Sequence, residues 1–309
     1  MNPSPRRVYI HDVAPRDGFQ IEPRFIPTER KIGLIDALEQ TGLAKIEVTS
    51  FTSQKSVPAL ADAETVMQGI TRVPGVELAV LVPNLRGCER ALACGVDEIN
   101  VVMSASASHN RANLRMTPEQ SVAQIESIVR AVGGRAAVNV SLSTAFGCPF
   151  EGDIPVTRVV EYVDRFVDIG LTRMSLCDTT GMANPVGVKQ LFDTVLARWP
   201  AIIFTAHFHN TRGMGLANAL AAHQAGVERF DASLGGLGGC PYAPGATGNV
   251  CTEDLVHMFH AMGIVTGVDL DKLIEVSVML PELVGHEVPS QVAKAGPWTR
   301  RYPVPGGSA

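Results

Sequence analysis

Aromatic residues, cysteine pairs and runs of like charge are all scarce in this chain of 309 residues. Phe, Trp and Tyr make up only 6% of it, so Ala, Val, Ile and Leu must fill most of any core. Apolar residues nevertheless amount to 46% and charged residues to 18%, which is typical of a globular protein and excludes an extended disordered chain.

No cluster of lysines or arginines accompanies the formal net charge of −5. The sequence therefore lacks the basic patch of a nucleic-acid-binding protein, and we expect no such partner. No apolar stretch is long enough to span a membrane, and none follows Arg6 and Arg7 as it would in a signal peptide. We expect no membrane partner, and the cytoplasm is the expected location.

The six cysteines lack the CxxC spacing of a structural zinc site or redox pair, and they suggest no disulfide framework. They are Cys88, Cys94, Cys148, Cys177, Cys240 and Cys251. We expect most of them to be small buried apolar residues. Two of them differ in position. Cys240 ends a glycine-rich segment after the last apolar run, and Cys148 lies just after the fifth apolar run.

Short β-branched or apolar runs alternate with longer amphipathic stretches along the chain. The expected strands are 8–14, 45–50, 77–82, 98–103, 136–143, 173–178, 202–208 and 229–234. The expected helices lie near 27–40, 58–69, 84–94, 117–131, 155–169, 184–198, 213–225 and 252–262. Strands this apolar, separated by helices, are typical of a parallel sheet covered on both faces.

Local signals support these helix limits. Pro27-Thr28-Glu29, Thr117-Pro118-Glu119 and Asn184-Pro185 each place a capping residue or a proline where apolar periodicity begins. Glycines follow four of the helices, as they do at helix C-termini. These are Gly42, Gly95, Gly170 and Gly226.

Eight evenly spaced strand–helix repeats favour a closed (β/α)8 TIM barrel, with an open doubly wound sheet as the alternative. The segment after the first strand, 15–20, has no glycine-rich dinucleotide fingerprint. We expect one catalytic domain over 1–309. The barrel would span about 8–262, one or two C-terminal helices about 264–295, and a loose tail 297–309.

Barrel active sites gather at the carboxyl ends of the strands, so polar residues there are the candidates. They are Arg16 and Asp17 after strand one, Glu47 in strand two, Asp178 ending strand six, His207 and His209 at strand seven, and Gly235–Gly239, Cys240 and Asn249 after strand eight. We expect all of them at one rim.

His207 and His209 are two residues apart on a strand, so their side chains face the same side. With the carboxylate of Asp17 and the amide oxygen of Asn249 they form a mixed oxygen and nitrogen set that suits Mg²⁺ or Mn²⁺. Zn²⁺ is less favoured because no thiolate belongs to the set. The alternative is structural: one histidine would be a hydrogen-bonded core residue and Asp17 a turn cap.

Glu47 lies within an apolar run, where a buried carboxylate must be paired, and Arg16 is the expected partner. Asp178 either contributes to chemistry or caps the following helix. The glycines of 235–239 indicate a mobile loop or a phosphate-binding turn. Cys240, at the tip of such a loop, could close over a substrate and exchange a proton.

Five segments together resemble the 3-hydroxy-3-methylglutaryl-CoA lyase family, over about residues 8–295. They are Pro15-Arg16-Asp17-Gly18-Phe19-Gln20, Ile46-Glu47-Val48-Thr49-Ser50-Phe51, Phe146-Gly147-Cys148-Pro149, His207-Phe208-His209 and Gly236-Leu237-Gly238-Gly239-Cys240-Pro241-Tyr242-Ala243. The last is specific to the lyases. The Arg-Asp and His-x-His elements also occur in isopropylmalate synthase and hydroxy-oxovalerate aldolase.

The resemblance implies cleavage of 3-hydroxy-3-methylglutaryl-CoA to acetyl-CoA and acetoacetate with Mg²⁺ or Mn²⁺. It implies metal ligands Asp17, His207, His209 and Asn249; catalytic residues Arg16, Glu47, Asp178, His207 and Cys240; and substrate-binding residues Arg16, Gln20 and Ser50. Arg16 would stabilise the enolate-like thioester oxygen. An acyl-CoA thioester is the implied partner, and the resemblance is compatible with a homodimer.

Two segments depart from the family pattern, namely 210–213, with Arg212, and Ser104–Arg115. Arg212 could contact an additional carboxylate or a CoA phosphate. A related 3-hydroxy-3-alkylglutaryl or citramalyl thioester therefore remains an alternative substrate. An aldolase or condensing synthase would share Arg16, Asp17 and the two histidines without Cys240. A non-enzymatic sensor or scaffold would not be expected to bind Mn²⁺ tightly.

Overall fold

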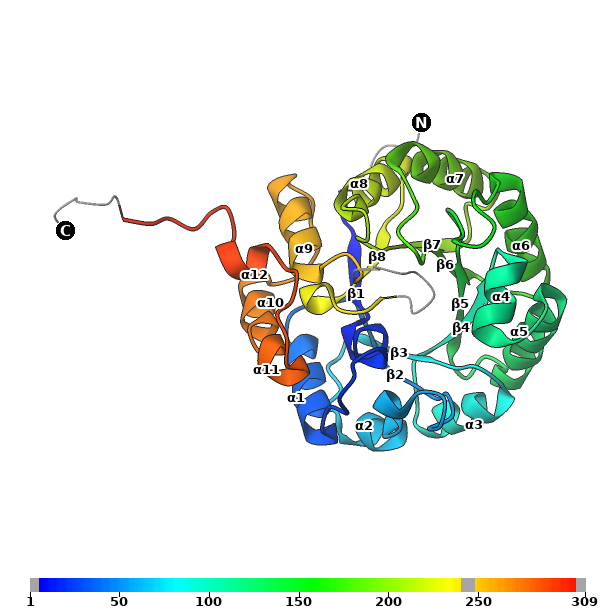
Figure 1. The fold of residues 1–309 in the computed structure, drawn as a ribbon, viewed down its shortest axis with the longest axis horizontal. Helices are drawn as coiled ribbons and strands as arrows, with labels where there is room; N and C mark the ends of the chain where they lie inside the picture. Colours follow the sequence, from blue (N-terminus) through cyan, green and yellow to red (C-terminus); the bar gives the residue numbers. More distant parts are fainter. Residues whose placement is uncertain (1–5, 240–247, 304–309) are drawn as a thin grey trace.

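The computed structural model describes residues 6–239 and 248–303, which form a closed barrel of eight parallel strands (Figure 1). The strands are β1 (Tyr9–Asp12), β2 (Lys45–Ser50), β3 (Glu77–Leu81), β4 (Glu98–Ser104), β5 (Ala137–Ser143), β6 (Arg173–Asp178), β7 (Ile203–Phe208) and β8 (Arg229–Ala232). Each strand pairs with the next, and β8 pairs with β1. The (β/α)8 prediction is confirmed, and the doubly wound alternative was wrong.

Helices surround the barrel in Figure 1. They are α1 (Thr28–Glu39), α2 (Ala63–Gly69), α3 (Leu85–Ala93), α4 (Ala107–Leu114), α5 (Pro118–Val132), α6 (Val156–Asp168), α7 (Pro185–Arg198), α8 (Gly215–Ala225) and α9 (Thr252–Ala261), followed by α10 (Leu270–Ser277), α11 (Leu280–Val284) and α12 (Val292–Ala295). None in the described part of the chain is long and apolar enough to cross a bilayer.

The predicted helix signals act as expected. Thr117 Oγ1 accepts a hydrogen bond from Gln120 N, and Gln120 Oε1 accepts one from Thr117 N; together these two bonds form the capping box of α5. The side chain of Asn184 accepts from the first turn of α7. Gly226, at φ 110°, ends α8 in the left-handed region that favours glycine.

Three local expectations were wrong. Helix α4 was not predicted; its segment has no strong apolar periodicity, and Ser106 caps it by accepting from His109 N. Strand β1 ends at Asp12, so Arg16 and Asp17 lie in a separate π-helical turn, η1 (Ala14–Gly18), rather than at the strand end. Between α9 and residue 303 there are three short helices rather than one or two.

Apolar side chains pack between the sheet and the helices, while much of the barrel interior is polar. Buried inward residues include Glu47, Glu98, Asn100, Asn139 and Ser175. Such groups are costly to bury unless they are hydrogen-bonded, so the strands must present partners at matched heights. This polar interior fixes the side chains of the site described next.

The cysteines that the structure describes are free, and four of the five are buried, as predicted. Cys94 is partly exposed. The Sγ atom of Cys148 lies 3.0 Å from Ser106 Oγ and accepts from Phe150 N at 3.3 Å. Cys148 is therefore held in a local turn. The sixth cysteine, Cys240, lies outside the described residues.

Candidate metal and catalytic site

Asp17, His207 and His209 come together at the carboxyl end of the barrel. Each offers a ligand atom, and these atoms lie within 4.8 Å of one another. The two imidazole centroids are 5.3 Å apart, and both histidines are buried. The sequence predicted this trio from the His-x-His spacing and a carboxylate after strand one. The structure confirms that the three are neighbours.

Asn249 joins the trio from the segment after β8. Its backbone forms a bridge with His209, and its Nδ2 donates to Asp17 Oδ2 at 2.7 Å and to the carbonyl of Leu237 at 3.0 Å. With the amide nitrogen used in this way, the amide oxygen is the atom suited to a hard cation. The four predicted ligand residues are therefore adjacent.

A glycine allows this close approach. Gly238 has φ of +102°, and a Cβ built on it would lie 2.6 Å from Asn249 Nδ2 and 3.3 Å from Asp17 Oδ2. A side chain here would both strain the backbone and displace the amide. The predicted glycine-rich loop thus has a clear local role at Gly238. Part of the same stretch, Leu234–Gly236, forms a 3₁₀ turn (η3), although no regular element was expected there.

The charges around Asp17 favour its ionised form. Burial raises the pKa of the carboxyl, but the combined effect of Arg16, His209 and His207 lowers it by more, so the pKa lies below the ordinary value. For His207, burial lowers the pKa while Asp231 and Asp17 raise it above the usual value. Asp17 is therefore a charged oxygen donor between two imidazoles.

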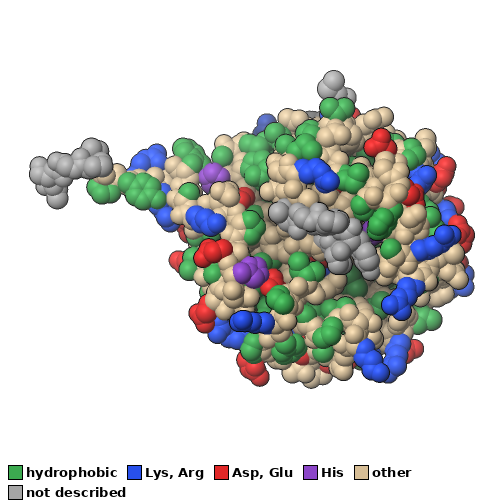
Figure 2. Space-filling view, viewed as in Figure 1, with side chains coloured by type: hydrophobic (Ala, Val, Ile, Leu, Met, Phe, Trp, Pro, Cys, Tyr) green, Lys and Arg blue, Asp and Glu red, His purple; other side chains and the backbone are tan. Residues whose placement is uncertain are grey.

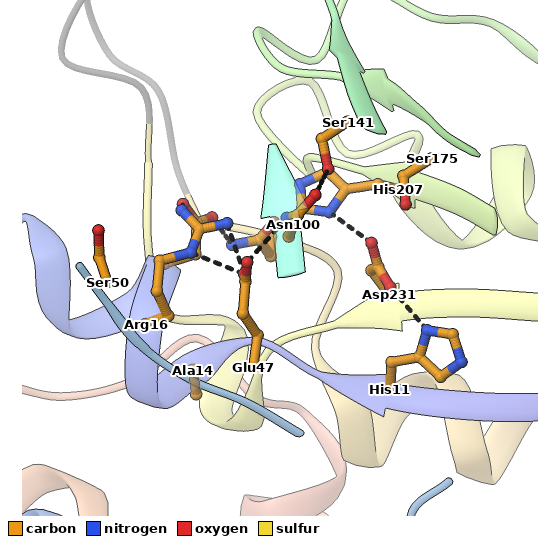
Figure 3. Close-up of polar contacts among 12 residues, drawn as sticks. His11, Ala14, Arg16, Glu47, Ser50, Asn100, Ser141, Ser175, His207 and Asp231 are labelled. Carbon is orange, nitrogen blue, oxygen red and sulfur yellow. Dashed lines mark hydrogen bonds and ion pairs between the residues drawn. The ribbon is translucent and has the colours of Figure 1, made fainter. Parts of the chain in front are cut away.

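Arg16 is held by two carboxylates, as Figure 3 shows in part. Its Nε and Nη2 contact Glu47 Oε2 at 2.6 Å, and its Nη1 donates to Asp17 Oδ1 at 2.8 Å. Burial alone would lower the pKa of the guanidinium, but Glu47 and Asp17 raise it above its ordinary value. The predicted Arg16–Glu47 pair is confirmed, and it fixes the arginine beside the ligand residues.

A buried amide network, not predicted from the sequence, continues from Glu47. Asn100 Nδ2 donates to Glu47 Oε1 at 2.8 Å, and Asn100 Oδ1 accepts from Asn139 Nδ2 and Ser141 Oγ. Asn139 Nδ2 also donates to Ser175 Oγ at 3.1 Å. Polar residues inside the strand runs of β4, β5 and β6 were the signal available to find it. The network prevents the Glu47 carboxylate from rotating away from Arg16.

Asp178 has one hydrogen-bonded oxygen and one unpaired oxygen. Its Oδ1 accepts from the backbone N–H groups of Met182 at 2.7 Å and Ala183 at 3.0 Å, in the turn before α7. Helix α7 is capped by Asn184 instead, so the alternative that Asp178 caps the following helix was wrong. Its Oδ2 is buried without a hydrogen-bond partner among the residues described. Burial raises the pKa of this carboxyl to about 6, although the two backbone donors and His207 oppose the rise.

The structure records no hydrogen bond between the proposed ligands and the two remaining predicted residues that it describes. Ser50 Oγ bonds to Thr52 Oγ1 at 2.7 Å and caps the turn after β2. Gln20 is partly buried and follows η1. Neither is linked to Asp17 by a hydrogen bond that the structure records, so their substrate-binding roles stay predictions. Cys240, the predicted loop cysteine, falls within 240–247 and outside the described residues.

A cavity of about 320 Å³ adjoins the segment after β6. It is lined by Cys148, Pro149, Gly152, Thr180, Met182, Thr211 and Arg212. The Nη1 of Arg212 donates to the carbonyls of Thr180 and Gly181, both at 2.9 Å, so the backbone orients this guanidinium.

In Figure 2, basic and acidic side chains are interspersed around the edge of the face, without one dominant basic patch.

Two further residues adjoin the site. His11 Nδ1 lies 2.9 Å from Asp231 Oδ1, and His207 Nδ1 lies 3.3 Å from Asp231 Oδ2 (Figure 3). Neither His11 nor Asp231 was predicted from the sequence. His11 lies within β1 and Asp231 within β8, and a titratable residue inside an expected strand was the signal available to find them.

Comparisons with known proteins agree with one another. The family model described as HMGL-like matches residues 7–280. The chain is 46% identical to hydroxymethylglutaryl-CoA lyase YngG of Bacillus subtilis, over 94% of this chain and 97% of that protein. It is 41% identical to the human mitochondrial hydroxymethylglutaryl-CoA lyase, over 96% and 91%. An HMG-CoA lyase structure from Acinetobacter baumannii, in complex with coenzyme A and 3-methylmalate, superposes with TM-score 0.94 at 49% identity, covering 99% of this chain and 100% of that one.

Proposed function

The chain belongs to the HMGL-like family and is a hydroxymethylglutaryl-CoA lyase, and we propose that the residues around Asp17 perform its reaction. The reaction cleaves a carbon–carbon bond of 3-hydroxy-3-methylglutaryl-CoA and yields acetyl-CoA and acetoacetate. The observation that supports this assignment of the site best is the convergence of Asp17, His207 and His209 beside Arg16. The four residues lie at the carboxyl end of the barrel, where barrel enzymes place their chemistry.

The donor set fits a divalent ion. One carboxylate, two imidazoles and an amide oxygen would bind Mg²⁺ or Mn²⁺ and leave positions for water and substrate. When bound, such an ion lowers the pKa of the substrate's tertiary hydroxyl and orients the substrate. We propose Asp17, His207, His209 and Asn249 as its ligands.

Arg16 is the proposed electrostatic catalyst. When the carbon–carbon bond breaks, its electron pair moves onto the thioester and negative charge develops on the carbonyl oxygen. A fixed guanidinium that faces this oxygen stabilises it by a few kcal/mol. Glu47 and Asp17 hold the Arg16 side chain before the substrate arrives, so little ordering is needed during the reaction.

Asp178 is the proposed acceptor of the hydroxyl proton. Its Oδ2 is buried without a partner among the described residues, and its pKa of about 6 suits proton transfer near neutral pH. The proton must then return to the methylene carbon that becomes the methyl group of acetyl-CoA. We propose Cys240 for this step, on the basis of its place in the lyase-specific loop sequence.

The substrate would enter at the same rim. The related Acinetobacter baumannii lyase was solved with coenzyme A and 3-methylmalate, which supports an acyl-CoA thioester as the substrate here. We propose that Gln20 and Ser50 contribute to its binding. A cytoplasmic location and a homodimer are further proposals, made from the sequence alone.

Release of acetyl-CoA from 3-hydroxy-3-methylglutaryl-CoA tests this function. Purified protein is assayed with Mg²⁺, with Mn²⁺ and with EDTA, beside a citramalyl thioester as an alternative substrate. We expect release that depends on the ion and is abolished by EDTA. Equal rates of release with and without EDTA would contradict the proposed metal site. Faster release from the citramalyl thioester would contradict 3-hydroxy-3-methylglutaryl-CoA as the preferred substrate.

A further inference from the structure

His11, Asp231 and His207 occupy matched positions on three neighbouring strands. In the register of the sheet, His11 on β1 pairs with Asp231 on β8, and Asp231 pairs with His207 on β7. Partners in a parallel sheet point to the same side, so all three side chains enter the barrel at one level. Figure 3 shows the carboxylate between the two imidazoles.

Each oxygen of Asp231 faces a different ring. Oδ1 lies 2.9 Å from His11 Nδ1, and Oδ2 lies 3.3 Å from His207 Nδ1. An ionised carboxylate only accepts hydrogen bonds, so both rings must present Nδ1–H to it. The proton of His207 is thereby placed on Nδ1, and the lone pair remains on Nε2.

We propose that Asp231, anchored by His11, is a positioning residue that holds His207 in the orientation and tautomer that a metal ligand needs. A ligating histidine commonly donates its other ring N–H to a carboxylate, which fixes the ring and strengthens its basic nitrogen. This inference rests on the proposed metal site. It assigns roles to two residues outside the proposed set of ligands.

His11 gives Asp231 its direction. His11 is only 3% exposed, and its ring forms the shorter of the two bonds, so it prevents the carboxylate from turning away from β7. The His207 contact is longer than an ordinary N–H···O bond, and it would gain strength when a cation withdraws electrons from the ring. Asp231 and His11 therefore affect His207 mainly when it is bound to a metal ion.

A measurement of Mn²⁺ binding tests this role. The full chain is first freed of metal with a chelator, and binding of added Mn²⁺ is then monitored by electron paramagnetic resonance. We expect Asp231→Asn to raise the Kd for Mn²⁺ by about 10 to 100-fold, since an amide cannot accept from both rings through oxygen. His11→Asn should raise it less, because Asp231 keeps its contact with His207.

Glu98→Gln is the matched control. Glu98 is another buried inward carboxylate, but it pairs with Lys45 and Arg173 and contacts none of the proposed ligands. We expect this variant to lose stability while its Kd for Mn²⁺ stays unchanged. Failure of the unaltered protein to bind Mn²⁺ would overturn the metal site and this inference together. Binding that is equal in the unaltered protein and Asp231→Asn would overturn the inference alone.

A second measurement depends neither on the folding of the Asp231→Asn variant nor on enzyme activity. Nitrogen NMR of the metal-free protein, labelled in its histidines, reports which ring nitrogen carries the proton. The His207 signal, assigned with a His207→Ala sample, should show the Nδ1–H tautomer. An Nε2–H tautomer of His207 would overturn the proposal.

Discussion

Asn249 Nδ2 donates to Asp17 Oδ2 across 2.7 Å, although 232 positions separate the two residues in the sequence. Their contact joins the turn after β1 to the segment after β8, which lie side by side because β8 pairs with β1. It places a carboxylate and an amide beside His207 and His209. Closure of the barrel thus assembles the proposed metal site.

Removal of the His207 imidazole should impair metal binding far more than folding. We expect His207→Ala to reduce Mn²⁺ affinity or turnover by orders of magnitude, because a ligand and its fixed geometry are both lost. Calorimetric titration with Mn²⁺ and a thermal melt measure the two effects. His286→Ala is the control, since His286 pairs with Glu22 and is not among the proposed ligands. A fully active His207→Ala enzyme would refute the site assignment.

A methyl group at position 238 should disturb the site from the backbone. In Gly238→Ala the new Cβ would meet Asn249 Nδ2 at 2.6 Å, so we expect at least about a tenfold loss of Mn²⁺ affinity. Gly75→Ala is a matched control: its φ of +94° imposes similar backbone strain, but nothing lies within 4 Å of the added carbon. Equal Mn²⁺ affinity in both variants would show that the close approach at Gly238 does not matter.

Cys240 should affect turnover rather than metal binding. The residue lies outside the described part of the chain, and this prediction rests on its sequence position in the lyase-specific loop. We expect Cys240→Ser to slow acetyl-CoA release while Mn²⁺ remains bound, because a serine hydroxyl is a much weaker acid than a thiol. Cys94→Ser serves as the control, because Cys94 follows the last residue of α3 and is not among the proposed site residues. Unchanged kinetics for Cys240→Ser would exclude the thiol from the mechanism.

The raised pKa of Asp12 should be visible in the pH dependence of the free energy of unfolding. Burial raises the pKa of this carboxyl to about 7, despite hydrogen bonds from Thr252 Oγ1 at 2.6 Å and Ala14 N at 2.9 Å. The folded state then holds this proton more tightly than the unfolded state does. Asp12 should therefore lower the free energy of unfolding as pH rises from about 4 to 7, by up to about 4 kcal/mol, with no further change above that range.

The Asp12→Asn variant isolates this effect from the other carboxylates. Urea unfolding of both proteins at several pH values gives the difference in their free energies of unfolding. We expect this difference to shift in favour of the variant as pH rises through the window. A difference that stays constant between pH 4 and 8 would show that Asp12 has an ordinary pKa in the folded protein.

Local sequence patterns were sufficient to predict the number, order and approximate limits of the strands, and to place eight of the helices. These follow from local causes: apolar periodicity, the Thr117 capping box, and glycines such as Gly226 that adopt positive φ. The ligand residues could also be predicted, because a His-x-His pair on a strand faces one way and strand ends meet at one rim.

The contacts that hold these residues in place could not be predicted from local patterns. Glu47 bonds to Asn100 because β2, β3 and β4 curve around a common interior, and Asp231 lies between His11 and His207 because β8 pairs with both β1 and β7. Such contacts depend on register and closure across strands far apart in the chain, which no local pattern specifies. A histidine within one apolar run and an aspartate in another become partners only once the barrel has closed.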